Sequence, residues 1–223
     1  MPECSEYRKF RRYPIQLPLL HTPKGPAPAQ PGVGWTRNLS EGGACVELAE
    51  RLPSRLPLWV RLRTERGAIE GEAEVTWAEE PPLVNGGILH GVAFTQLALD
   101  PLQAVRDLII NKGLVRPART RLPFEAPVTY QLRGEAGPPL HGWTHDISRG
   151  GLLLRLPQLL PLGTPLVVTL HTPTGPLTTE GTVTWVAPPE GRTPGGPIRH
   201  GVQFTALDWS TARSLGLVLA ESV

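Results

Sequence analysis

The sequence repeats itself in tandem. The segment GWTRNLSEGG at residues 34–43 returns as GWTHDISRGG at residues 142–151. Further along, VTW at residues 75–77 returns at residues 183–185, and the HGV-x-F pattern at residues 90–94 returns at residues 200–204. A register held over so much of the chain indicates one structural unit written twice. We place the boundary near residue 113, which predicts domains of residues 1–112 and 113–223.

Short alternating segments predict that each copy is built from β-strands. Leu58, Val60 and Leu62 alternate with more polar residues, which places the aliphatic side chains on one face of a strand. The chain also contains 26 Pro and 24 Gly, residues that favour turns between short elements. Several short strands in about 100 residues favour an all-β fold with a small antiparallel barrel per copy, with a β-sandwich as the alternative.

One short helix is expected after the last strand of each copy. In the first copy Asp100 is predicted to cap the helix and Pro101 to occupy its first turn, with Val105 on its apolar face. In the second copy Asp208 begins the equivalent segment. The apolar positions of the second helix are expected at Ala212, Leu215 and Leu219.

Composition excludes several classes of protein. The formal net charge is +2, from 22 basic and 20 acidic residues, which is too balanced for a general nucleic-acid coat, so no direct DNA contact is expected. No apolar stretch is long enough for a membrane helix, and the charged start lacks the apolar centre of a secretory signal. Two cysteines form no disulfide framework. We therefore expect a cytoplasmic protein without membrane insertion.

Two polar segments of the first copy could bind an anion. Arg8 and Arg12 lie in an arginine-rich segment before the first strand, and arginine forks onto phosphate or onto the O6 and N7 acceptors of guanine. Asn38, Ser40 and Gly43 form an Asn-x-Ser-x-x-Gly element between two strands. Alone, such an element is typical of a β-turn held by side-chain hydrogen bonds, and the arginine segment is typical of a solvated arm.

Taken together in this order, these residues resemble the bipartite motif of a PilZ domain. The resemblance extends to Trp77 and to the Gly-Val-x-Phe pattern at residues 91–94, and the second copy resembles another PilZ domain. It implies two tandem six-stranded antiparallel barrels that bind the bacterial second messenger cyclic di-GMP. Arg8 and Arg12 would then grip phosphates and guanine edges, Asn38 and Ser40 would bind a guanine, and Gly43 would keep the turn open to the ligand.

The second copy departs from this pattern. It keeps Asp146, Ser148 and Gly151, but Pro117 takes the place of Arg8 when Arg121 is aligned with Arg12. Arg116 and Arg119 lie nearby and could substitute for the missing arginine. We expect impaired or absent ligand binding in this copy, which would leave it a scaffold or partner-binding role.

The resemblance implies a non-enzymatic receptor that changes its arm and interdomain arrangement and signals to a protein partner. No cofactor is expected, no catalytic or metal-binding constellation is found in the sequence, and homo-oligomerisation is left open. The alternative is a protein-interaction module of the same fold that has lost one or both nucleotide sites. His90 and His200 are expected to be structural, and Trp35, Trp77, Trp143 and Trp185 to pack on the barrels.

Overall fold

Two compact units make up the chain. The computed structural model describes residues 10–25, 29–79, 86–113, 120–135, 137–189 and 195–221, with the side chains of 112 and 113 excepted. The first unit comprises Met1–Thr120 together with Ala220–Val223, and the second comprises Arg121–Leu219. The predicted boundary near residue 113 stays a prediction.

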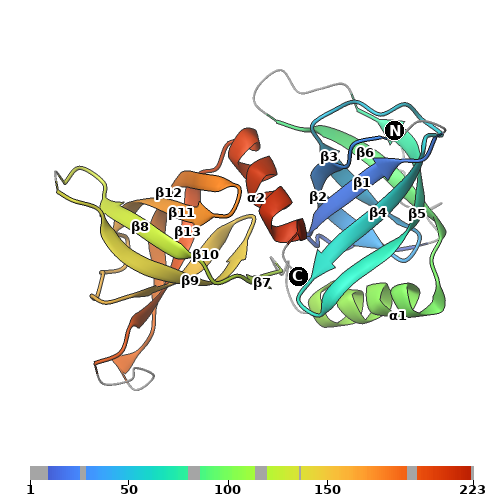
Figure 1. Cartoon of the computed structure of the whole chain (residues 1–223). Coiled ribbons are helices and arrows are strands. Elements are labelled where there is room, and N and C mark those ends of the chain that lie inside the picture. The colour runs from blue at the N-terminus through green and yellow to red at the C-terminus, as the bar shows by residue number, and fades with distance from the viewer. Residues whose placement is uncertain are drawn as a thin grey trace, which may run out of the picture. The chain divides into compact units, whose positions relative to one another are not determined.

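The first unit is a closed six-stranded antiparallel barrel (Figure 1). Its strands are β1 (Pro18–Pro23), β2 (Gly32–Ser40), β3 (Gly43–Leu48), β4 (Pro57–Thr64), β5 (Gly67–Ala78) and β6 (Ile88–Gln96). They follow one another around the barrel in the order β1, β2, β3, β6, β5, β4, and β1 pairs with β4 to close it. The barrel expectation is confirmed, and the sandwich alternative is wrong.

The second unit repeats this barrel. Its strands are β8 (Pro127–Leu132), β9 (Leu140–Ser148), β10 (Gly151–Leu156), β11 (Pro165–Thr172), β12 (Gly175–Val186) and β13 (Ile198–Ala206). The pairings β9–β10 and β8–β11 close it. A two-residue strand, β7 (Leu122–Pro123), adds to β9 from outside, and the first unit has the matching contact as an isolated bridge between Tyr13 and Leu39.

Strand alternation fills both barrels as predicted. Leu58, Val60 and Leu62 on β4 are all buried and belong to one hydrophobic core. Their counterparts on β11, the buried residues Leu166, Val168 and Leu170, follow the same alternation. The aliphatic face of each strand therefore fills a barrel interior, while the alternate residues form the outer face on which a ligand can lie.

A helix follows each barrel, but the two begin differently. In the first unit, α1 (Leu99–Leu108) continues into a π-helical turn, η1 (Ile109–Gly113); its N-cap is Ala98, with no side-chain cap. The prediction that Asp100 is the cap is therefore wrong, because the helix begins two residues earlier than predicted and Asp100 lies in its first turn. In α2 (Trp209–Glu221), Asp208 does cap: its Oδ1 accepts from the Thr211 amide at 2.7 Å. The apolar residues predicted for α2 are all buried.

A buried histidine occupies the same place in each barrel. The His90 ring lies with Nε2 3.0 Å from the Leu52 amide, which donates to it, and with Nδ1 3.0 Å from the Ile88 carbonyl oxygen. The second barrel repeats both contacts at His200 with Leu160 and Ile198. A ring that accepts at one nitrogen and donates at the other is neutral, and burial lowers the pKa of His90. The structural interpretation of both histidines is confirmed.

Candidate functional site

A threonine fixes the entry of the chain into the first barrel. The Thr36 hydroxyl donates to the Ile15 carbonyl oxygen at 2.6 Å and accepts from the Leu17 amide at 2.8 Å, while the Thr36 amide donates to the Leu17 carbonyl oxygen. Thr36 is fully buried, so these bonds are shielded from water. They hold the segment before β1 against β2, the strand that carries the polar motif.

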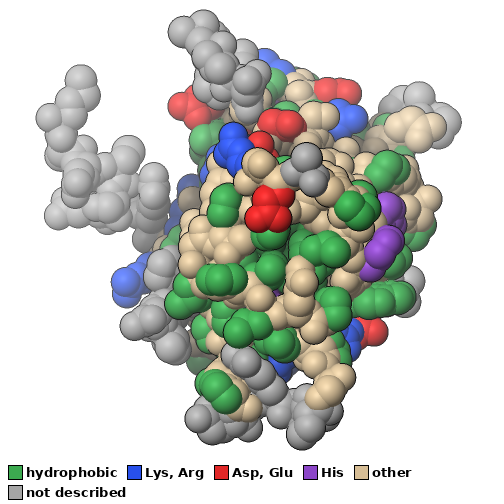
Figure 2. All heavy atoms as spheres, turned by 90° about the vertical axis from the view of Figure 1, so that its left-hand side faces the viewer, with side chains coloured by type: hydrophobic (Ala, Val, Ile, Leu, Met, Phe, Trp, Pro, Cys, Tyr) green, Lys and Arg blue, Asp and Glu red, His purple; other side chains and the backbone are tan. Residues whose placement is uncertain are grey.

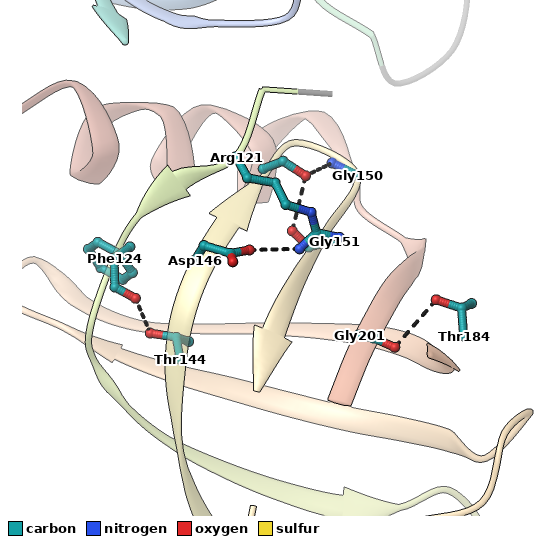
Figure 3. Close-up of polar contacts among 9 residues, drawn as sticks. Arg121, Phe124, Thr144, Asp146, Gly150, Gly151, Thr184 and Gly201 are labelled. Carbon is teal, nitrogen blue, oxygen red and sulfur yellow. Dashed lines mark hydrogen bonds and ion pairs between the residues drawn. The ribbon is translucent and has the colours of Figure 1, made fainter. Parts of the chain in front are cut away.

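The second barrel repeats this arrangement with Thr144. Its hydroxyl contacts the Phe124 carbonyl oxygen at 2.5 Å and the Ala126 amide at 2.9 Å. Figure 3 shows the Phe124 contact on the same strand that carries Asp146. Sequence reasoning missed this role, although the signal was present: the tripeptide GWT precedes the motif in both copies.

The hydrogen bonds of Thr36 to Ile15 and Leu17, called the Thr36 clamp below, place Arg12 next to the motif. Tyr13 and Leu39 form an antiparallel pair, with two backbone hydrogen bonds of 2.9 Å. In such a pair the preceding residue of one strand faces the following residue of the other, so Arg12 lies opposite Ser40. Asn38 and Ser40 flank the buried Leu39 along the strand. With Gly43, which pairs with Ser40 across the turn, the structure thus brings together four of the five predicted residues of the first site.

A β-bulge at Arg37 shapes the strand beside Asn38. The pairing of β2 with β3 shifts between Thr36 and Asn38, and the Asn38 Oδ1 accepts from the Cys45 amide at 3.3 Å. Arg37 forms an ion pair of 2.9 Å with Glu47. Burial raises the pKa of the Cys45 thiol, and the positive charges of Arg12 and Arg37 oppose the rise. The charge of Arg12 therefore acts on Cys45, the residue that pairs with Asn38.

The turn of the motif is closed by its own side chain. The Ser40 hydroxyl donates to the Gly43 carbonyl oxygen at 3.0 Å, which leaves the hydroxyl oxygen free to accept a further hydrogen bond. Gly43 has φ of +154°, and a Cβ there would lie 2.1 Å from the Val92 carbonyl oxygen. Glycine is required because β3 approaches β6 too closely for any side chain.

Two elements besides the strands contact this turn. A Cβ on Gly42 would lie 2.6 Å from the Phe10 ring, so the arm before β1 lies directly on the turn. In addition, Arg106 of α1 forms an ion pair of 2.9 Å with Glu41. The motif turn therefore contacts both the arginine-rich arm and the helix that ends the first copy.

An exposed tryptophan extends the outer face of the site. Asn38 pairs with Cys45, Cys45 with Gly91, and Gly91 with Trp77, so these residues form one row across four neighbouring strands. Trp77 is 38% exposed, and a Cβ on Gly91 would lie 2.0 Å from its Nε1. The expectation of barrel packing is confirmed for the buried Trp35. For Trp77 it is incomplete, because much of the ring that covers Gly91 faces solvent.

The second copy holds its arginine in an ion pair. The Arg121 Nη1 lies 2.7 Å from the Asp146 Oδ1, and Figure 3 shows the Arg121 side chain reaching across to Asp146 and the turn at Gly150 and Gly151. The Ser148 hydroxyl donates to the Gly151 carbonyl oxygen at 3.1 Å, as in the first copy. The structure thus brings together all four of these motif residues in the second copy.

The two copies differ in the charge that faces the arginine. Asn38 is neutral, and within the described residues Arg12 makes no hydrogen bond or ion pair. Asp146 is acidic, and its carboxylate forms an ion pair with Arg121. The other predicted arginines, namely Arg8, Arg116 and Arg119, lie outside the described residues.

The first site combines a cation with small polar groups and an aromatic face. Arg12 can fork onto a phosphate or a guanine edge, Ser40 and Asn38 present hydrogen-bonding atoms beside it, and Trp77 offers a flat surface for stacking a base. Within the described ranges no group of three or more His, Cys, Asp or Glu side chains could hold a metal ion. No helix among the described residues is long and apolar enough to cross a membrane.

Comparison with known proteins identifies the unit that is repeated. The family model of the PilZ domain matches residues 6–111 and again residues 116–220. No curated protein sequence matches the chain.

Solved structures similar to the chain include those of three proteins. PlzA of Borreliella burgdorferi in complex with c-di-GMP is 11% identical, with a TM-score of 0.38, over 91% of this chain and 88% of that one. MotI/DgrA, the Bacillus subtilis inhibitor of motility, is 10% identical, with a TM-score of 0.39, over 91% and 94%. The PilZ domain of CeSA from a cellulose-synthesizing bacterium is 21% identical, with a TM-score of 0.36, over 45% and 96%.

Proposed function

Because the chain belongs to the PilZ family, whose domain model covers both of its barrels, we propose that it is a non-enzymatic receptor that binds cyclic di-GMP at the first barrel. The single observation that carries this proposal is the position of Arg12. By the pairing of Tyr13 with Leu39, Arg12 lies opposite Ser40 and close to Asn38, and it makes no ion pair within the described residues. A ligand with two phosphates and two guanines is bound well by arginine side chains, which form paired hydrogen bonds, together with small polar side chains that hydrogen-bond the base.

Each residue of the first site has a role in this proposal. Arg12, joined by Arg8 from the arm, binds phosphate and the guanine edge. Asn38 and Ser40 hydrogen-bond a guanine, and Trp77 stacks on a base. Gly43 keeps the turn open to the ligand while it lets β3 approach β6 closely.

Ligand binding would reach the rest of the chain through the motif turn. That turn contacts the arm at Phe10 and the helix α1 through the Glu41–Arg106 ion pair. We therefore place the output in a rearrangement of the arm and of the connection between domains, read by a protein partner. The ligand is the only small molecule in the proposal, and no cofactor takes part.

The second barrel is assigned weaker binding and a scaffold role. Its Arg121 is already held by Asp146, and a ligand must break that pair before the guanidinium becomes available. The side chain that takes the place of Arg8 is Pro117, which carries no charge.

Calorimetric titration of the intact chain with cyclic di-GMP tests the proposal. We expect saturable binding at micromolar concentration. Replacing Arg12→Ala removes charge-assisted hydrogen bonds, each of about 1.5–3 kcal/mol, and should weaken binding about 10- to 150-fold. Arg11→Ala is the matched control, because the Arg11 guanidinium lies 5.5 Å from the centre of the Tyr13 ring rather than on the motif.

Two outcomes would overturn the proposal. If the folded chain ignores the nucleotide at millimolar concentration, it is not a receptor for this ligand. If Arg12→Ala and Arg11→Ala have equal effects, the assignment of the site is wrong. Circular dichroism of both variants confirms that each is folded.

A further inference from the structure

The second barrel carries a pocket that contains none of its motif residues. Its volume is about 360 Å³, and it is lined by His141, Trp143, Arg155 and Pro157 together with the turn at residues 195–197. Small-molecule sites fall in the range of about 300 to 1,000 Å³, so the pocket has the size of a site for a small ligand.

The wall of this pocket combines an exposed aromatic ring, Trp143, with the cation Arg155, and a second cation, Arg199, lies next to Arg155 outside the lining. Trp143 pairs with Arg155 on the next strand, and Arg155 pairs in turn with Arg199. Trp143 is 53% exposed, whereas the equivalent Trp35 of the first copy is 1% exposed. A large aromatic side chain left in water beside a polar rim is typical of a binding surface.

The neighbouring arginines are unfavourable without a ligand. Like charges on directly opposed residues of an antiparallel pair destabilise a sheet. Glu125 forms an ion pair with Arg155, but Arg199 makes no ion pair within the described part of the chain. At the same positions the first barrel has a buried acid, Glu47, and an aliphatic residue, Leu89. The cationic pair is therefore a property of the second barrel alone.

The turn that completes the pocket leaves room for a ligand close to the backbone. Gly195 has φ of +71°, a conformation that favours glycine, and a Cβ there would meet no atom within 4 Å. The space-filling view in Figure 2, taken from the side that lies to the left in Figure 1, shows hydrophobic side chains gathered over the middle of that face.

We propose that this pocket binds a nucleoside phosphate, with the base stacked on Trp143 and the phosphate held by Arg155 and Arg199. A flat ring fits the exposed indole, and stacking of a base on an aromatic side chain is tolerant of base identity. The phosphate suits the two neighbouring guanidinium groups, because its oxygens can accept paired hydrogen bonds from each of them. The site is separate from the proposed cyclic di-GMP site of the first barrel and does not depend on it.

Calorimetry of the intact chain tests this proposal with GMP, AMP and UMP, and with guanosine and inorganic phosphate as partial ligands. We expect saturable binding of the nucleotides and binding at least tenfold weaker for guanosine or phosphate alone. Trp143→Ala should weaken nucleotide binding between about 5- and 150-fold. Arg199→Gln should also weaken it, while the control Arg133→Gln, which alters an exposed arginine paired with Glu180, should not.

Several outcomes would overturn the proposal. They are the absence of nucleotide binding at millimolar concentration, equal binding of phosphate and nucleotides, and binding unchanged by both Trp143→Ala and Arg199→Gln. Arg199 is exposed, so its variant tests the site even if Trp143→Ala fails to fold. A titration of the Arg12→Ala variant with cyclic di-GMP shows which nucleotide the pocket holds. Residual binding that is lost when Trp143→Ala is added identifies cyclic di-GMP itself as the nucleotide bound in this pocket.

Discussion

His21 should make the first barrel sensitive to acid. It is 7% exposed, its Nδ1 has no hydrogen-bond partner among the residues that the structure describes, and its ring lies against Gly32. Burial, and then the nearby His90, lower the pKa of His21 from 6.5 to about 4. The unfolded chain therefore binds a proton that the folded barrel refuses, and the stability contributed by neutral His21 is complete above pH 6.5 and is lost as the pH falls toward 4.

The size of this loss follows from the two pKa values. Relative to pH values above 6.5, the free energy of unfolding of the first barrel falls by about 2 kcal/mol at pH 5. The full loss, below pH 4, is about 3 kcal/mol. For a domain of this size a loss of 2 kcal/mol lowers the urea midpoint by about 1–2 M. The second barrel has Tyr130 at the equivalent position, which does not titrate in this range.

Urea unfolding followed by NMR measures the two barrels separately in one sample. Between pH 7.5 and pH 5 the midpoint of the first barrel should fall further in the wild type than in His21→Leu or in His21→Tyr, the residue of the second copy. His90 is present in all three proteins, so the difference between them reports His21 and its interaction with His90. An equal fall in the wild type and both variants would refute the reasoning.

Three further predictions follow from single contacts. Gly43→Ala should destabilise the first barrel by more than about 2 kcal/mol in urea unfolding because its Cβ would overlap the Val92 carbonyl oxygen, whereas Gly25→Ala, with nothing within 4 Å, should be nearly neutral. Thr36→Val should cost about 2–3 kcal/mol because two buried backbone groups lose their partner; a loss below 0.5 kcal/mol would contradict the clamp. Asp146→Asn should release Arg121 and raise affinity for cyclic di-GMP at the second barrel up to about fivefold by calorimetry, the value of a partly exposed ion pair; unchanged or weaker binding there would argue against the pair as an obstacle.

The repeat made the fold predictable, because it supplied the strand pattern twice. Alternation along Leu58, Val60 and Leu62 gave the inward face, and the structure has those side chains in the core. The helix start was less predictable: Asp100 and Asp208 occupy equivalent positions, yet only Asp208 caps its helix. Capping depends on the backbone conformation of one residue, which residue type alone does not fix.

The candidate site was predictable in its composition but not in its contacts. Trp35 and Trp143 are equivalent in sequence yet differ in exposure from 1% to 53%, because burial on the outer face depends on what covers it. The pairing of Arg121 with Asp146 joins residues far apart in the chain, and no local pattern predicts it. Thr36 lies in the repeated tripeptide GWT, but no sequence pattern predicts the hydrogen bonds that its side chain makes.

The central claim is that the first barrel binds cyclic di-GMP on the face where Arg12, Asn38 and Ser40 meet. Amide NMR spectra of the labelled intact chain, recorded during a titration with the nucleotide, test it most directly. The account predicts that the largest shift changes occur at residues 10–13 and 38–43, with little change at Gly67 in the β4–β5 turn. Spectra that stay constant at millimolar nucleotide, or that change only away from this face, would contradict it.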